Sequence, residues 1–333
     1  MNFCLIGTGV GAAMNAKAIR KISGAKILAV AGSTEKHFNL FAQKYGIPRC
    51  YQNTKEMLEK EKPNAVIIAS IPTKHWRDIL LCKDYCKIII VEKPIVTDIN
   101  LIPKIREIVK DNQISLSVVY QHRYDSSYQK LKKLLPSIKD DIYYINLISS
   151  DYRRERYYKN FGFWRRTHEK SGGGVLIQHG IHLINFLFSL FNYKYSLIEA
   201  KKFYQNGVET ESAVLANFLI EEKINCAVFS SRMSPEIKNG IYIYGRTNSY
   251  FINENSFLIF KAGKENKIIF KLREYVKNFP VGLNWQRHYH KGRHQDFLRD
   301  VVMKNNDTKK ESLFLEDALN DIILIHKVYN FNI

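Results

Sequence analysis

The sequence lacks the features that mark secreted and membrane-spanning chains. Its start, Met-Asn-Phe-Cys-Leu-Ile-Gly, has no cationic region ahead of the apolar residues, which predicts a first strand and not a secretory signal. The longest apolar stretch, residues 175–191, is interrupted by Gln178, His179, His182 and Asn185, which would be costly in hydrocarbon. The five cysteines are scattered, without the spacing of a zinc site. These absences predict a soluble cytoplasmic protein with reduced thiols and no metal or membrane partner.

Acidic residues are few beside basic ones, 32 against 51, and the formal net charge is +19. Such a chain attracts anions, nucleic acids among them. The lysines and arginines are nevertheless spread along the whole length, among abundant isoleucine and asparagine, which indicates a general compositional bias. We therefore predict no nucleic-acid partner. One cluster is local, and it consists of Arg153, Arg154, Arg156, Lys159, Arg165 and Arg166.

The 333 residues suffice for two hydrophobic cores, and they contain no short repeat or low-complexity segment. Through residue 119, short apolar runs alternate with amphipathic segments, which is typical of a parallel sheet covered on both faces. The expected strands are residues 2–6, 27–31, 65–70, 88–91 and 114–119. The expected helices are residues 11–22, 35–45, 55–61, 74–85 and 101–111. We predict a doubly wound α/β Rossmann domain over residues 1–120.

After Gln121 the pattern changes to strands joined by short turns, which is typical of antiparallel pairing. The expected strands are residues 142–149, 197–204, 212–220, 224–231, 241–244, 249–252, 257–260 and 267–272. The expected helices are residues 128–135, 174–191, 293–303 and 315–329. We predict that residues 121–333 form an α+β substrate and oligomerisation domain with one large, mostly antiparallel sheet. An open face of that sheet would pair with a second copy, giving a homodimer or tetramer.

A glycine-rich turn, Gly7-Thr8-Gly9-Val10-Gly11-Ala12, follows the first expected strand and opens a helix. The first glycine permits a tight turn, the second lets the backbone approach a pyrophosphate, and Ala12 fits the small position where helix and strand pack. The helix that begins there points unpaired N–H groups and its positive dipole end at phosphate. A glycine-rich turn also occurs for steric reasons alone, but its place within a βαβ unit favours a dinucleotide site.

The choice between NAD and NADP stays open. A carboxylate usually ends the second strand of a NAD site, where it binds the ribose 2′-hydroxyl. Here the segment reads Ala31-Gly32-Ser33-Thr34-Glu35-Lys36, and no acid stands at the expected position. Ser33, Thr34 and Lys36 can donate hydrogen bonds to a 2′-phosphate, but no arginine is present to bind one.

Two further motifs carry chemistry-bearing side chains. Glu92-Lys93-Pro94 follows the expected strand 88–91, at the sheet edge where ligands of doubly wound folds bind. Taken alone, Lys93 would be a solvated surface lysine before a turn. Gly172-Gly173-Gly174 opens an apolar helix on which Gln178, His182 and Asn185 recur at helical spacing. Such groups are either satisfied core residues or the lining of a cavity, and three on one face favour the cavity.

These motifs together resemble the glucose–fructose oxidoreductase and inositol dehydrogenase (Gfo/Idh/MocA) family. The resemblance covers nearly the whole chain. It rests on the glycine-rich turn and on Pro72-Thr73-Lys74-His75, Glu92-Lys93-Pro94, Arg123-Tyr124-Asp125, Trp164-Arg165, Gly172-Gly173-Gly174…His182 and the late Gly292-Arg293-His294-Gln295. It implies an NAD(P)-dependent oxidoreductase that passes hydride between nicotinamide C4 and a sugar alcohol or ketone, in sugar metabolism or polysaccharide biosynthesis.

The resemblance also implies roles for single residues. Lys93 would hydrogen-bond the reacting oxygen and His182 would donate or accept its proton, with Gln178 beside them as a third catalytic residue. Many family members carry Asp or Asn in place of Gln178, and a glutamine cannot take up a proton at ordinary pH. The residues expected to contact the cofactor are Gly7, Thr8, Gly9, Val10, Gly11, Ala12, Ser33, Thr34, Ser70, Pro72, His75, Glu92, Lys93 and Gln121. Those expected to contact substrate are Arg123, Tyr152, Arg154, Trp164, Arg165 and Asn185.

The basic, aromatic loop before the triple glycine bears on the substrate. Arginine forks suit phosphates and carboxylates, and aromatic rings suit a sugar or base face. We expect an anionic substrate, either a nucleotide-linked or an acidic sugar, although a merely solvated basic loop has the same composition. Two other functions stay open: a non-catalytic dinucleotide-binding regulator, which would lack Lys93 or His182, and a glycosidase that recycles a tightly held cofactor.

Overall fold

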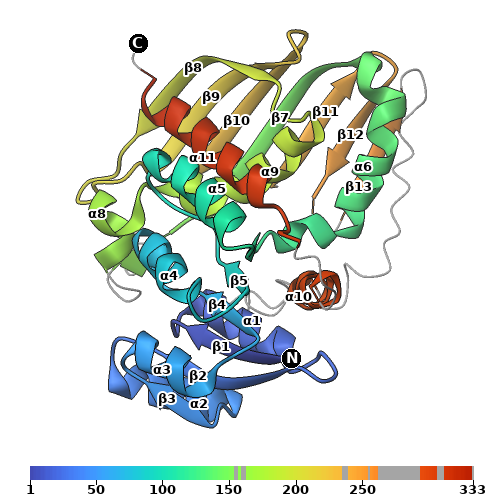
Figure 1. Ribbon diagram of the computed structural model, residues 1–333. Coiled ribbons are helices and arrows are strands. Elements are labelled where there is room, and N and C mark those ends of the chain that lie inside the picture. The colour runs from blue at the N-terminus through green and yellow to red at the C-terminus, as the bar shows by residue number, and fades with distance from the viewer. Residues whose placement is uncertain are drawn as a thin grey trace, which may run out of the picture.

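Two β-sheets lie at opposite ends of the computed structural model, with helices between and around them (Figure 1). The structure describes residues 1–153, 157–158, 163–234, 239–253, 256–261, 293–305 and 311–331. The expected strand at residues 267–272, Gly292 and several members of the basic loop, Arg154 among them, lie outside the described residues. The predicted fold class, a Rossmann sheet beside a larger mostly antiparallel sheet, is confirmed.

The first sheet is parallel throughout, in the order β3-β2-β1-β4-β5-β6. Its strands are β1 (Asn2–Ile6), β2 (Lys26–Ala31), β3 (Arg49–Tyr51), β4 (Ala65–Ile68), β5 (Ile88–Val91) and β6 (Ser115–Val118). The central strands β4 and β5 are buried at every position, because helices cover both faces. The edge strand β3 was not predicted, since three residues, Arg-Cys-Tyr, carry too short a pattern to detect.

The helices of this part match the predicted segments, with ends shifted by a few residues. They are α1 (Val10–Ile19), α2 (Glu35–Tyr45), α3 (Thr54–Glu61), α4 (His75–Cys82) and α5 (Ile102–Asp111). The Asn53 side chain caps α3 by accepting hydrogen bonds from two backbone N–H groups of its first turn. The start of α1, by contrast, has no side-chain cap. Its first N–H groups are therefore available to a ligand.

The second sheet has the order β13-β12-β11-β7-β10-β9-β8. Its strands are β7 (Ile142–Ser150), β8 (Tyr195–Phe203), β9 (Ala213–Ile220), β10 (Ile224–Ser231), β11 (Gly240–Gly245), β12 (Asn248–Ile252) and β13 (Phe257–Lys261). All neighbours pair antiparallel except β7 and β10, which are parallel because β7 precedes the hairpins and inserts between β10 and β11.

Helices pack on one face of this second sheet (Figure 1). They include α6 (Ser126–Ile138), α9 (Ile181–Leu190) and α11 (Leu315–Tyr329). The short α8 (His168–Ser171) instead contacts the turn at Pro72–Lys74, and α10 (Arg293–Lys304) contacts α1 of the first part of the chain (Figure 1). Phe188 of α9 packs edge-on against Phe218 of β9, with 5.0 Å between ring centroids. The stretch His168–Leu190 is long and apolar enough to cross a membrane, but 72% of its most apolar window is buried inside the protein. It is equally what the core helix of a globular protein looks like.

The C-terminal segment returns to the first sheet. Leu313 runs beside β6: its carbonyl oxygen accepts from Val118 N at 3.0 Å, and its N–H donates to Ser117 Oγ at 3.0 Å. Farther along, α11 lies across the second sheet near α9 and α5 (Figure 1). A domain boundary near residue 120 stays a prediction, and the last helices contact both parts of the protein.

Candidate functional site

The glycine-rich turn has the shape that a dinucleotide phosphate requires. Gly7 has φ +107°, and a Cβ there would lie 2.3 Å from the carbonyl oxygen of Ala69, so only glycine fits. A Cβ on Gly9 would meet no atom within 4 Å, which leaves open space above the turn. Ala12 is fully buried where α1 packs on the sheet. The uncapped N-terminus of α1 and this open backbone fit a pyrophosphate.

Glu92 supports the same turn from below. Its carboxylate accepts a hydrogen bond from Asn15 Nδ2 at 2.8 Å and lies 3.0 Å from where a Cβ on Gly11 would stand. Burial raises the pKa of Glu92, and the neighbouring Lys93 ammonium opposes that shift. Glu92 and Lys93, adjacent in sequence, thus lead to different partners, Glu92 to the glycine-rich turn and Lys93 to the second part of the chain.

The remaining expected cofactor residues divide into two groups. His75 is buried, and its ring nitrogens lie 2.8 Å from Pro94 O and 3.1 Å from Ser70 O, so it ties the end of β4 to the end of β5. Pro72 is buried beside it. Gln121 is only 5% exposed, yet its Oε1 has no hydrogen-bond partner among the described residues. A buried acceptor of this kind fits a ligand that donates a hydrogen bond.

The end of β2 explains why no acid stands there. A Cβ on Gly32 would lie 3.1 Å from the Phe38 side chain and 3.2 Å from the Thr8 side chain, so those residues occupy the space of a carboxylate. Ser33 and Thr34 are exposed, and Thr34 precedes α2 without using its hydroxyl as a cap. Their hydroxyls remain available to a ribose or its phosphate.

Lys93 joins the two parts of the chain. Its Nζ donates to the backbone oxygen of Gln178 at 2.5 Å, which places the ammonium one helical turn before His182. The pKa of Lys93 is lowered to about 8, chiefly by burial and also by the nearby Arg232 and Arg165, while Glu92 opposes them. Lys93 is therefore close to its own titration point near neutral pH.

The triple glycine brings the His182 helix against three other segments. A Cβ on Gly172 would lie 2.2 Å from Thr97, one on Gly173 would lie 2.5 Å from Tyr329 Oη, and one on Gly174 would lie 1.9 Å from Glu211 O. The Glu211 carboxylate, only 3% exposed, accepts from Gly174 N at 2.6 Å and from Leu176 N at 3.1 Å. Glu211 thus caps the helix, and sequence reasoning missed it because nothing in the local pattern marks it.

A π-helical turn at Leu176–Gly180 changes the predicted helix face. The expected face contained Gln178, His182 and Asn185, but Asn185 is fully buried while Gln178 and His182 are partly exposed. His182 has its ring centroid 4.7 Å from that of His122 and 6.2 Å from that of Tyr120. His179, not predicted as a site residue, also faces this region: burial, together with Arg232 and Lys93, lowers its pKa well below the usual value.

Arg232 is the second residue that sequence reasoning missed. It follows β10, is 5% exposed, and donates from Nη1 to Gln178 Oε1 at 2.9 Å. The ring of Tyr157 is faced by three guanidinium carbons, those of Arg153 at 4.7 Å, Arg165 at 5.3 Å and Arg232 at 5.6 Å. Arg232 escaped notice because only the sheet register brings it from 54 residues away to Gln178.

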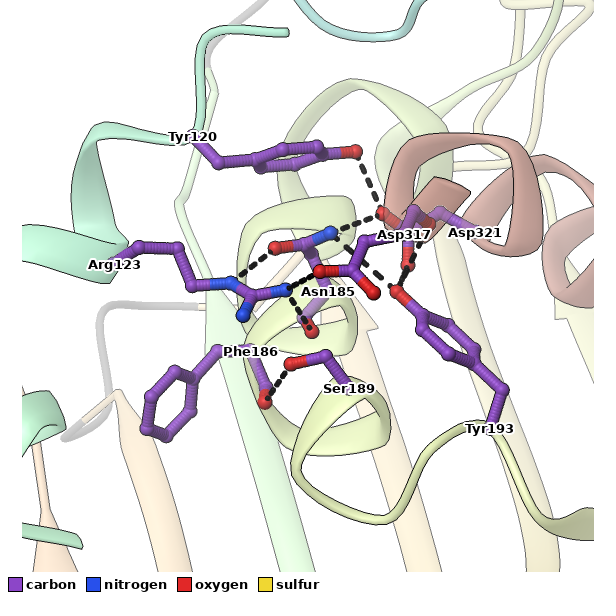
Figure 2. A network of polar contacts seen from close by, with 8 residues as sticks. All are labelled: Tyr120, Arg123, Asn185, Phe186, Ser189, Tyr193, Asp317 and Asp321. Carbon is purple, nitrogen blue, oxygen red and sulfur yellow. Dashed lines mark hydrogen bonds and ion pairs between the residues drawn. The ribbon is translucent and has the colours of Figure 1, made fainter. Parts of the chain in front are cut away.

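The expected substrate residues Arg123 and Asn185 lie in a separate network (Figure 2). Arg123 donates to Asn185 Oδ1 at 2.7 Å and pairs with Asp317 at 2.7 Å. Asn185 Nδ2 donates at 2.7 Å to Asp321, which also accepts from Tyr120 Oη at 2.6 Å. Asn185 has no exposed surface, whereas the Arg123 side chain is 15% exposed, and a contact of either residue with substrate stays a prediction.

Two further residues expected to contact substrate, Trp164 and Arg165, lie against each other in the loop, and their role stays a prediction. The Arg165 guanidinium carbon stacks 4.0 Å from the Trp164 ring centroid, and Arg165 is close enough to lower the Lys93 pKa. Tyr152 is half exposed. Arg154 lies outside the described residues.

Comparison with known families gives two matches. The model of an oxidoreductase family with an NAD-binding Rossmann fold, GFO/IDH/MocA, matches residues 1–120. The GFO/IDH/MocA C-terminal domain model matches residues 128–251. In sequence, the chain is 23% identical over 223 residues to trans-1,2-dihydrobenzene-1,2-diol dehydrogenase of Danio rerio. That alignment covers 66% of this chain and 64% of the relative, just under two thirds of its length.

Solved structures share the fold over almost the whole chain. An oxidoreductase of Thermotoga maritima superposes with TM-score 0.82 at 19% identity, covering 99% of this chain and 96% of that one. The WlbA dehydrogenase of Bordetella pertussis, solved with NADH and UDP-GlcNAcA, gives TM-score 0.80 at 16% identity, covering 98% and 93%. At such identities these likenesses concern the fold alone.

Proposed function

Since the chain belongs to the Gfo/Idh/MocA family of NAD-binding oxidoreductases, we propose that it is an NAD(P)-dependent sugar dehydrogenase or ketoreductase. The substrate would be the secondary alcohol or ketone of an anionic sugar, acidic or nucleotide-linked. The observation that carries the proposal is the hydrogen bond from Lys93 to Gln178, which joins the carboxyl edge of the Rossmann sheet to the helix of His182.

The residues present can handle the proton that accompanies hydride transfer. A bound nicotinamide supplies the hydride acceptor or donor. Lys93, with its pKa lowered to about 8, can orient the substrate oxygen and share its proton. His182 stands one turn along the helix and would exchange that proton with solvent. Gln178 can hold its neighbours in place but cannot take up a proton, so we assign it a positioning role.

Charge supports an anionic substrate over a neutral one. The zebrafish relative is named for an uncharged diol. Here Lys93, Arg153, Arg165 and Arg232 are close enough to shift one another's or a neighbour's pKa. Arg153 pairs with Asp151 and Glu92 opposes the charge of Lys93, but no described carboxylate is paired with Arg232, and a buried cation is costly unless an anion joins it. An acidic or nucleotide-linked sugar provides that anion.

The test uses Lys93→Met and His182→Ala with NAD and NADP, against sugars and polyols, free and nucleotide-linked, read by nicotinamide absorbance. We expect both variants to bind NADH as the wild type does and to lose about 10²- to 10⁴-fold in kcat/KM. Near-normal turnover in either variant would contradict the catalytic assignment. Reduced cofactor released into solution would exclude a glycosidase that retains its cofactor. If the wild-type protein turned over none of these compounds, a non-catalytic regulator would be favoured.

We further propose a homodimer or tetramer built on the face of the second sheet opposite α9. Leu215, 37% exposed, pairs across the strands with Phe229, and Phe229 pairs with Ile148, so apolar side chains line this face. An exposed apolar sheet face commonly pairs with a second copy. Leu215→Glu should lower the mass measured by light scattering. An unchanged mass, or a monomeric wild type, would contradict the proposal. Five free cysteines fit a reducing compartment, and we propose the cytoplasm.

A further inference from the structure

Arg232 is held rigidly, and part of its guanidinium is unused. Its backbone N donates to Ser212 O at 2.8 Å and its carbonyl accepts from Arg153 N at 3.0 Å, so both flanking segments fix the main chain. Nη1 donates to Gln178 Oε1 at 2.9 Å. Nε is buried and has no hydrogen-bond partner among the described residues. The edge formed by Nε and Nη2 is the fork that binds a carboxylate through two parallel hydrogen bonds.

No carboxylate of the described residues is paired with Arg232. The ion pair of the neighbouring Arg153 is with Asp151. The Arg232 guanidinium is bonded to a neutral amide and faces the Tyr157 ring at 5.6 Å, and neither partner has a negative charge that neutralises it, which is costly for a buried cation. Its neighbours add to the cost: the positive charge of Arg232 reaches Lys93, His179 and Arg165. A protein keeps such an arrangement where an anion binds.

Gln178 fixes how far the anion can be from the reacting carbon. Its side-chain oxygen contacts Arg232, and its backbone oxygen contacts Lys93 Nζ. Gln178 therefore bridges the two cationic groups. An anion on Arg232 and a hydroxyl on Lys93 can then belong to one small molecule. A carboxylate of the sugar itself also matches the two parallel donors of the Arg232 fork.

We propose that Arg232 binds the carboxylate of a sugar acid whose reacting hydroxyl lies within a few bonds of that carboxylate. This inference rests on the proposed function and narrows its substrate class to uronic or aldonic acids, free or carried on a nucleotide. Arg232 thereby sets specificity, and the Gln178 amide aligns the guanidinium with Lys93. The alternative is that Arg232 only holds Gln178 in place.

The experiment compares acid and neutral members of matched pairs on the NADH-bound protein. The pairs are D-gluconate with D-glucitol, D-glucuronate with D-glucose, and UDP-glucuronate with UDP-glucose. Binding is measured by calorimetry, and turnover by nicotinamide absorbance with NAD. Wild type, Arg232→Gln and Arg232→Lys are used, with Arg299→Gln as control, because Arg299 is a half-exposed arginine on α10 paired with Asp296.

We expect at least one acid to bind more tightly than its neutral partner by about 10- to 100-fold. Arg232→Gln should abolish that preference and Arg232→Lys should restore only part of it, since an ammonium lacks the fork. Arg299→Gln should behave as the wild type. Circular dichroism and NADH affinity, which a folded variant retains, separate loss of the site from loss of the fold.

The outcomes distinguish this inference from the proposed function. If no acid binds more tightly than its neutral partner, or if the preference survives Arg232→Gln, the inference is wrong. UDP-glucose binding as well as UDP-glucuronate would assign the anion site to the diphosphate instead. Turnover of neutral sugars without acid preference would leave the dehydrogenase standing and overturn only the inference. Tight, Arg232-dependent binding of an acid without any turnover would support the inference and contradict the proposed dehydrogenase.

Discussion

Two buried polar clusters flank the helix that carries His182, and they differ in charge balance. The cluster around Asp321 is balanced: the carboxylate receives hydrogen bonds from Tyr120, Tyr193 and Asn185, and Arg123 pairs with Asp317 (Figure 2). The cluster around Arg232 gathers cations with few described carboxylates. Each polar group of the first cluster has a partner within the protein, and we propose that the second cluster takes its anion from a ligand. The comparison predicts that variants of the two clusters will behave differently.

The free energy of unfolding should differ most between variants of the two clusters. Asp321→Ala leaves three buried donors without an acceptor, and we expect it to lower the free energy of unfolding by about 3–5 kcal/mol. Arg232→Gln removes a charge that no described carboxylate balances, so it should cost less than about 1 kcal/mol or raise stability. Urea unfolding of both variants measures this. Equal losses would show that Arg232 is structural and would break the comparison.

The pH profile of oxidation should shift by a smaller but specific amount. Lys93 must be neutral to accept a proton, so kcat/KM should rise with pH through a pKa of about 8. Arg232 lowers that pKa, so Arg232→Gln should move the inflection to higher pH, and the rate relative to the wild type should be lowest below pH 8 and recover at higher pH. Asp321→Asn lies in the balanced cluster and should leave the inflection in place. An unmoved inflection in Arg232→Gln would mean that Lys93 does not titrate in the reaction.

Gln178→Ala should have the smallest effect. It removes the Arg232 contact but keeps the backbone oxygen that binds Lys93, so kcat/KM should fall less than about tenfold. The steady-state rate with the best sugar acid measures it. A fall of more than 100-fold would indicate that the glutamine contributes directly to the chemistry, as the family resemblance implies for this position.

The sequence was sufficient for the parts of the molecule that local patterns determine. Apolar strands such as β5 and the glycine-rich turn can be predicted from the sequence, because periodicity and backbone sterics depend on residues that are close along the chain. The register of the second sheet was not predictable, and it alone brings Arg232 to Gln178. The π turn at Leu176–Gly180 was also missed, since nothing in the letters distinguishes it from an ordinary helix. An ordinary helix would place Asn185 on one face with Gln178 and His182, whereas in the structure Asn185 is buried and the other two are partly exposed.

The last helix, α11, is synthesised late and contacts the residues that surround the His182 helix. Asp317 and Asp321 of α11 bind Arg123 and Asn185, and Tyr329 donates to Glu211, which caps the His182 helix. Until the ribosome has released residue 329, the helix with His182 lacks these anchors, however early the glycine-rich turn has folded. The surroundings of His182 are therefore completed only once α11 is in place.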